Sequence, residues 1–221
     1  MYFTTEFIRF FEELSENNHR DWFQANKPRF ENQVKKPFVA FVSELINRVQ
    51  QDDPLVTIEP KEAMFRIYRD VRFSKDKAPY KTHMSAVISP KGRKDHGYPG
   101  LYVQMNHENI ALAGGGYQLD KEQLYRLRTL IASQPKRFQE LIEDPEFTSR
   151  FGELQGKEHK RIPKEFKEAV ADQPLLMKKQ MYYWTEIDRE HITSPQLVDL
   201  LMEYYEAAKL MKAFFTEAMV G

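Results

Sequence analysis

The sequence predicts an α+β fold, with a central, mainly antiparallel sheet flanked by N-terminal and C-terminal helices. Apolar residues recur at three- and four-residue steps in the first and last thirds of the chain, which is the period of a helix packed on one side. Residues that favour strands concentrate between positions 64 and 113. Because the strands are grouped instead of alternating with helices, the pattern favours α+β over a βαβ arrangement. We expect a single domain over residues 1–221.

The N-terminal third reads as helical. A first helix is expected with Thr4 or Thr5 as its cap, and its apolar face holds Phe3, Phe7, Ile8, Phe11 and Leu14. Residues 20–26 form a short helix that carries Trp22 and Phe23. A longer helix begins at Pro28 and runs past Val49, with a kink or break expected at Pro37.

The middle third changes to extended segments. Four segments are rich in strand formers, namely residues 64–69, 84–89, 101–106 and 109–113. The last two are joined by His107-Glu108, which predicts a hairpin that the glycines at 114–116 close.

The last third returns to helices. Asp120 followed by Gln123 predicts a capping box and a helix through Ala132. Short helices are expected at residues 135–142 and 145–151, and another one is expected to begin near Pro163. Residues 176–187 return as a strand, and a long final helix runs from Ser194-Pro195 to about residue 220.

Composition narrows the classes of function. The chain has 33 Lys and Arg against 33 Asp and Glu, a balance that argues against a protein dedicated to coating DNA. It has no cysteine, which excludes disulfides, thiolate zinc sites and a cysteine nucleophile. No signal peptide or apolar run of membrane-spanning length is evident, so we expect a soluble cytoplasmic protein without a membrane partner. The six histidines show no metal-ligand spacing, so no metal site is predicted, and no cofactor is indicated.

The most unusual segment is the basic run from Arg66 to His83, which carries six Arg or Lys, two Asp and one His. If this run is extended, Arg66 and Arg72 share one face with Asp70, and Arg69 lies on the other. Arginines this close repel one another unless a negative group lies between them. That group is a ligand phosphate, a ligand carboxylate or an acid of the protein itself.

The candidate site residues follow from this run. Ligand-binding roles are predicted for the donors of the run and for the backbone of Gly116 at the start of a helix, namely Arg66, Arg69, Arg72, Ser74, Lys75, Lys81 and Gly116. Catalytic roles are predicted for three residues. Asp70 would orient an arginine, and Tyr80 or His83 would supply hydroxyl or proton-transfer chemistry. The structural alternatives are an ion-pair network for the basic run, packing for the glycines and a hydrogen-bonded structural role for His83.

The same run closely resembles the hallmark of a conserved hypothetical family of bacteria and fungi, domain of unknown function 2461. The resemblance extends to Asn17-Asn18, Trp22-Phe23 and Asn26-Lys27, and to the three glycines followed by Tyr117, with Arg128 on the next helix. It therefore covers essentially the whole chain. Ala78 and Tyr117 stand where threonine and tryptophan are common in the family, and neither difference removes a charge. The resemblance implies one domain and a site hypothesis, with no established activity.

Three functions remain open on the sequence. The first is an enzyme or binding protein for a phosphorylated or carboxylated small molecule. The second is a nucleic-acid-binding module that uses the same residues as a phosphate track. The third is an interaction protein whose basic run is neutralised by its own acids. Converging arginines in a closed site favour the first, and an open basic surface with exposed aromatic residues favours the second. The sequence does not indicate an oligomeric state.

Overall fold

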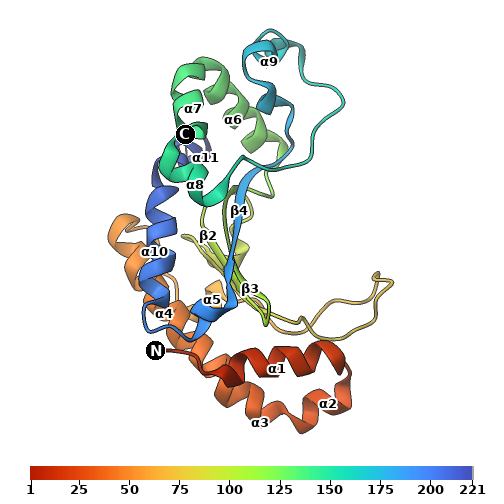
Figure 1. The fold of residues 1–221 in the computed structure, drawn as a ribbon. Coiled ribbons are helices and arrows are strands. Elements are labelled where there is room, and N and C mark those ends of the chain that lie inside the picture. The colour runs from red at the N-terminus through yellow and green to blue at the C-terminus, as the bar shows by residue number, and fades with distance from the viewer. Residues whose placement is uncertain (221) are drawn as a thin grey trace. The chain divides into compact units, whose positions relative to one another are not determined.

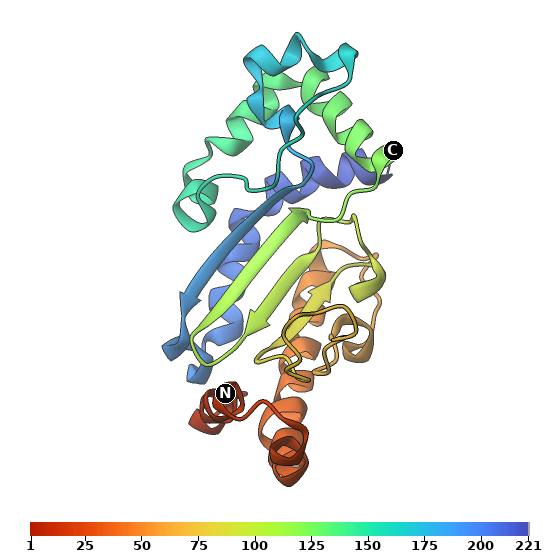
Figure 2. The same ribbon diagram turned by 90° about the vertical axis from the view of Figure 1, so that its right-hand side faces the viewer.

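The computed structural model describes residues 1–220 and confirms the α+β class. A four-stranded antiparallel sheet has the order β1-β2-β3-β4 and consists of Met84–Ile88, Leu101–Met105, Asn109–Gly116 and Met181–Asp188 (Figures 1 and 2). Neighbours in the sheet are therefore also consecutive strands in the chain. Within residues 1–220, no helix combines the length and the apolar character that crossing a membrane would require.

The chain divides into two compact units. The first contains Met1–Lys94, Tyr102–Leu112 and Glu186–Met202, and the second contains Asp95–Leu101, Ala113–Thr185 and Glu203–Gly221. Strands β2, β3 and β4 each contribute residues to both units. Neither unit is a single stretch of sequence, and one domain over residues 1–221 stays a prediction.

The first unit has a core of phenylalanine rings. Its N-terminal helical elements are α1 (Thr5–Glu16), α2 (Arg20–Ala25), α3 (Lys27–Arg29), the π-helical turn η1 (Phe30–Lys35), α4 (Lys36–Asp52) and α5 (Pro60–Ala63). Eight rings from these helices and the preceding residues are 4% exposed or less, namely Phe3, Phe7, Phe10, Phe11, Phe23, Phe30, Phe38 and Phe41. Helix α4 packs against β1 and so joins this aromatic core to the sheet. The unit also holds the short helices η2 (Gly92–Lys94) and η5 (Arg189–Thr193).

The helix expected from Pro28 is interrupted before Pro37, as predicted. The interruption is the π-helical turn η1, after which the N–H of Lys36 donates to the carbonyl of Glu31, five residues back. Proline has no N–H to donate, and Pro37 lies in the first turn of α4, where that loss is tolerated. The sequence did not predict the short helix α5.

The extended segment at residues 64–69 is not a regular strand, which corrects the expectation. It pairs with β1 and with the chain before β1 through two isolated bridges, Met64 with Ala86 in the strand and Tyr68 with Tyr80 before it. Between the two bridges, residues 64–68 span four steps along the chain, whereas residues 80–86 span six. The longer side therefore contains two extra residues, which form a bulge. This bulge breaks the ladder that the strand-forming residues would otherwise make.

The second unit is mainly helical. It contains α6 (Lys121–Ser133), α7 (Pro135–Ile142), α8 (Pro145–Phe151), η3 (Lys164–Phe166), α9 (Ala169–Asp172), η4 (Pro174–Met177) and α11 (Lys209–Val220). The capping box at Asp120 is confirmed, because Gln123 N–H donates to its carboxylate at 2.8 Å and the Gln123 side chain accepts from Asp120 N–H at 3.0 Å. Helix α11 packs against α6 and α7.

The long final helix expected from residue 194 is instead two helices, α10 (Leu197–Ala207) and α11. They meet at Ala208, whose N–H is shared between the carbonyls of Tyr204 and Tyr205 at 3.2 Å each. Such a shared bond tightens a turn and ends the regular α-helical pattern.

Two glycines of the second unit test how tightly its strands pack. Gly115 has φ +92°, and a Cβ there would lie 2.7 Å from the Met181 carbonyl oxygen, whereas Gly152 has φ +64° and open space around it. Both Gly→Ala variants incur backbone strain, but only Gly115→Ala adds a collision. We expect Gly115→Ala to lose about 1–3 kcal/mol more unfolding free energy than Gly152→Ala in urea titrations. Equal losses would contradict this packing.

Candidate functional site

Three cationic or titratable side chains of the basic run gather in the first unit, and we call Arg66, Lys81 and His83 the cationic cluster. Arg66 lies on the segment between the two bridges, and Lys81 and His83 lie in the bulge opposite it. Lys81 N–H donates to the Ile67 carbonyl at 2.8 Å, which fixes the two chains side by side. The bulge therefore brings together residues that are 15 or more positions apart in the sequence.

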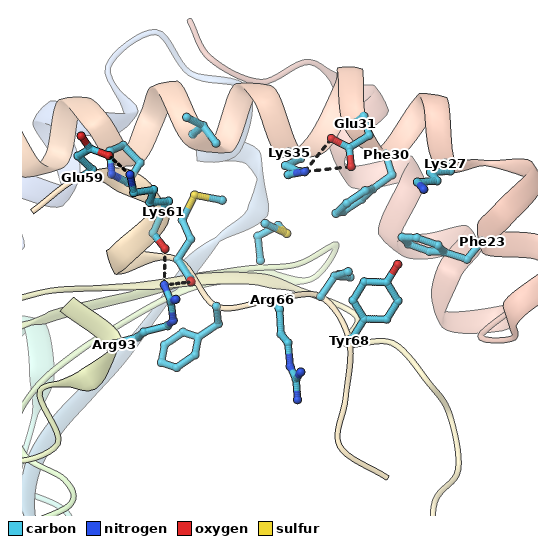
Figure 3. Close-up of a pocket in the computed structure, with 16 residues that line it drawn as sticks. Phe23, Lys27, Phe30, Glu31, Lys35, Glu59, Lys61, Arg66, Tyr68 and Arg93 are labelled. Carbon is cyan, nitrogen blue, oxygen red and sulfur yellow. Dashed lines mark hydrogen bonds and ion pairs between the residues drawn. The ribbon is translucent and has the colours of Figure 1, made fainter.

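Aromatic rings lie beside the cluster. The Lys81 ammonium is 5.0 Å from the centre of the Phe65 ring, which is a cation–π contact. The Phe65 ring in turn meets Tyr102 edge-on, with the ring centres 6.5 Å apart, and the Tyr102 hydroxyl donates to Gln104 at 2.8 Å. Figure 3 shows the Arg66 side chain pointing away from the helices that carry Lys27 and Lys35. Arg66 is exposed, whereas Lys81 and His83 are half-buried.

Among the described residues, no ion-paired acid matches the positive charge of the cluster, and Arg66 interacts only at longer range with Asp70, whose pKa is lowered mainly by Arg72 and less by Arg66. Burial lowers the pKa of Lys81, and the nearby Arg66 lowers it further. Burial also lowers the pKa of His83 to about 4, with a further contribution from Lys81. Across residues 1–220, none of the three side chains forms an ion pair with a carboxylate. An anion bound here would relieve both effects, since an opposite charge favours the protonated forms.

The other two arginines of the run are bound to acids of the protein. Arg69 contacts Asp76 at 2.5 Å and also donates to the Ala78 carbonyl at 3.0 Å. Arg72 donates two hydrogen bonds to the Asp70 carboxylate, from Nε at 2.9 Å and from Nη2 at 2.6 Å. Hydrogen bonding to Arg72 lowers the pKa of Asp70. The pKa of Asp76 is also lowered, mainly by a hydrogen bond from the Ala78 N–H and then by one from the Arg69 side chain. Asp70 therefore neutralises Arg72, and its predicted role in a site stays a prediction.

Residues 69–79, which include both paired arginines and end at Pro79, form an extended loop that we call the arm (Figure 1). Phe73 in this arm is 95% exposed, and the Arg72 guanidinium lies 5.9 Å from the Phe73 ring centre. Ser74 and Lys75, predicted to bind a ligand, lie in this arm and not in the cationic cluster. Ser74 N–H donates to the Val71 carbonyl at 3.3 Å, so it serves a turn of the arm.

Tyr80, a predicted catalytic residue, lies in the aromatic core. It is 3% exposed and stacks on Phe23 with the ring centres 4.0 Å apart. Burial is the main cause that raises the pKa of Tyr80, and its hydroxyl bonds Gln24. Its backbone pairs with the Asn18 amide, which donates to the Tyr80 carbonyl at 2.9 Å and accepts from its N–H at 3.1 Å. The structure thus gives Tyr80 an anchoring role.

Asn18 is the residue whose role the sequence reasoning missed. Asn17 and Asn26 bond carbonyls of the preceding helices, as asparagines at helix ends commonly do. Asn18 instead reaches 62 residues along the chain to hold Tyr80. The sequence feature that pointed to this contact was that the two asparagines and the central basic run occur together in the family pattern.

Gly116 and Arg128 belong to the second unit. A Cβ on Gly116 would lie 2.8 Å from the Leu119 side chain, which would have to shift to accept it. Arg128 is 4% exposed and donates to the carbonyls of Leu176 and Lys178 at 2.9 and 3.1 Å. It ties helix α6 to the chain that precedes β4. In the part of the chain that the structure describes, no group of three His, Asp or Glu is placed to hold a metal ion.

A family model described as "Conserved hypothetical protein (DUF2461)" matches residues 6–214. The match spans the cationic cluster, the arm and the asparagine that anchors Tyr80. No curated protein matches the chain.

The lowered pKa of His83 predicts a specific pH dependence of stability. With a folded-state pKa of about 4 and an ordinary value of 6.5, the unfolded chain binds more protons between these values. The contribution of His83 to stability therefore falls as pH drops from 6.5 to 4. We expect this fall, up to about 3 kcal/mol, to be missing from His83→Gln in urea titrations at several pH values.

The matched control is His96→Gln, which changes an exposed histidine of a polar loop and should keep the wild-type pH profile. Identical pH profiles for wild type and His83→Gln would contradict the burial of a neutral His83.

Proposed function

The chain belongs to the family described as conserved hypothetical protein (DUF2461), whose description names no reaction, and we propose that it binds a small molecule through a phosphate or carboxylate group. The observation that carries the proposal is the cationic cluster, which has three positive or protonatable groups and no acid partner among residues 1–220. The anion would lie between Arg66, Lys81 and His83.

The contrast within one motif supports this assignment. Asp70 and Asp76 neutralise Arg72 and Arg69, so the chain supplies acids to two of its three closely spaced arginines. In the described residues no carboxylate is ion-paired with Arg66, Lys81 or His83, and Asp70 interacts with Arg66 only at longer range. Two unit charges 4 Å apart interact by about 4 kcal/mol at an effective dielectric of 20. A ligand anion among three such groups therefore converts repulsion into attraction.

His83 gives the site a link between binding and protonation. Its pKa of about 4 leaves the imidazole neutral at pH 7 when no anion is bound. A bound anion raises this pKa, because it favours the charged imidazolium. Of the three groups, His83 is therefore the one that we propose to gain a proton when an anion binds, and its acid or base role stays a prediction.

A second candidate function is binding of single-stranded nucleic acid through the arm. The observation that favours it is Phe73, which is 95% exposed and lies beside Arg72. Exposed aromatic rings stack on bases, and neighbouring cations contact phosphates. The small anion is the better-supported ligand, because Arg69 and Arg72 are already paired with acids and the cluster is partly buried.

Sulfate tests the proposal, since its charge stays constant across the pH range in which His83 titrates. We expect Lys81→Met to bind sulfate at least tenfold more weakly than wild type in isothermal titration calorimetry at constant ionic strength. The loss of one charged contact of about 1.5–3 kcal/mol gives this size. Without sulfate, Lys81→Met should unfold at the same or a higher temperature, because it removes the repulsion from Arg66 and keeps the aliphatic stem.

The control is Arg72→Gln, which removes a cation of the arm that is paired with Asp70 and should leave sulfate binding unchanged. A Lys81→Met variant that is clearly less stable and binds sulfate normally would show that the cluster is structural. Binding of a 20-nucleotide oligothymidylate that weakens in Phe73→Ala, stays normal in Lys81→Met and falls steeply with salt would establish the nucleic-acid alternative instead.

A further inference from the structure

The first unit contains a groove beside the segment that carries Arg66. It has a volume of about 740 Å³ and lies between the helical run α3, η1 and α4 and the extended residues 64–68 (Figure 3). Its apolar lining comes mainly from Phe23, Phe30, Val39, Met64, Ile67 and Met84. The volume lies within the range of small-molecule sites, about 300–1,000 Å³.

The lining can hold a flexible apolar chain. Two of the six residues are methionines, whose unbranched side chains adapt to ligands of irregular shape. Val39 is 38% exposed although it is apolar and lies on the wall of the groove. Apolar surface of this kind is stabilised when a ligand removes it from water.

The rim of the groove is positively charged, and most of its polar groups are engaged. Lys35 pairs with Glu31 at 2.9 Å, and Lys61 pairs with Glu59 at 2.6 Å. The Arg93 guanidinium donates to the carbonyls of Glu62 and Met64 at 3.1 Å each, and also to that of Lys61. Lys27, in contrast, has no ion pair within residues 1–220.

Lys27 lies at one end of the groove. Figure 3 shows Lys27 beside Phe23 and Phe30, with the Tyr68 hydroxyl directed toward the same end. Tyr68 is 46% exposed, so its hydroxyl is accessible to a ligand. One ammonium and one hydroxyl donor at the end of an apolar groove complement a single carboxylate attached to an apolar chain.

We propose that the groove binds an unbranched acyl carboxylate, with its chain along Phe30, Val39 and Met84 and its carboxylate at Lys27 and Tyr68. The site is distinct from the cationic cluster. Arg66 borders the groove, but its guanidinium points away from it (Figure 3).

A peptide strand fits this groove less well. The backbone of residues 64–69 is engaged with the chain leading into β1, since Phe65 N–H bonds Ser85 and Arg69 N–H bonds Pro79, both at 2.9 Å. Strand addition requires free backbone donors and acceptors at an edge. A nucleobase fits poorly as well, because the apolar lining offers few hydrogen-bonding groups to recognise its edge.

Dodecanoate below its micelle concentration is the probe, measured by isothermal titration calorimetry. Each buried methylene contributes about fourfold in affinity, so dodecanoate, with two more methylenes, should bind roughly fifteenfold more tightly than decanoate. Dodecyltrimethylammonium, which has the same chain and the opposite charge, should bind at least tenfold more weakly than dodecanoate.

Two variants locate the ligand. Val39→Trp fills the groove and should weaken dodecanoate binding at least tenfold, whereas Leu55→Trp places the same ring at a 63% exposed position outside the groove and should change nothing. Lys27→Glu should weaken binding at least fivefold, and Lys36→Glu, on the same helical run but outside the lining, should not. Lys81→Met should bind dodecanoate normally, which separates this site from the cationic cluster.

Three results would overturn the proposal. These are the absence of dodecanoate binding, equal affinity for the cationic analogue, or loss of binding in Lys81→Met with normal binding in Lys27→Glu. Thermal unfolding checks that Val39→Trp is folded, and if it is not, Lys27→Glu and the cationic analogue decide the outcome.

Discussion

Stacking of Tyr80 on Phe23 fixes the basic run against the helices of the first unit, and the placement of the cationic cluster depends on it. Phe23 is 1% exposed and contacts Phe30, with the ring centres 5.2 Å apart, so Tyr80 is anchored to a rigid aromatic core. The Asn18 amide holds the backbone of the same residue. Four residues later the chain enters β1 at Met84. Lys81 and His83 lie between these two fixed points, so the bulge leaves them little freedom to leave Arg66.

Charge is distributed unevenly along a chain whose formal net charge is zero. The arm balances its own arginines with Asp70 and Asp76, and such exposed pairs contribute little to stability. The cationic cluster, in contrast, keeps a lysine and a histidine half-buried beside an arginine, which lowers the pKa of both. An arrangement that costs stability and has no acid partner in the described residues is typical of a binding site. The lack of an ion-paired acid in the described residues distinguishes the cluster from the paired arginines of the basic run.

The sequence predicted the helices better than the site. Periodic apolar residues, the capping box at Asp120 and the proline at position 37 act locally, so they can be read without the fold. The bulge could not be predicted, because it is set by bridges between residues that the sequence separates by 12 and 22 positions. The three arginines look equivalent in the sequence. Only the folded arm shows that Asp76 and Asp70 bind Arg69 and Arg72 and leave Arg66 to the cluster.

The central claim is that His83 lies in an unbalanced positive environment that an anion neutralises. The most direct test is the pKa of His83 from the pH titration of its imidazole proton in NMR spectra, with and without saturating sulfate. The signal is assigned by its absence from His83→Gln. The account predicts a pKa of about 4 without sulfate and a clear rise when sulfate binds. A pKa near the ordinary 6.5 that sulfate does not change would contradict it.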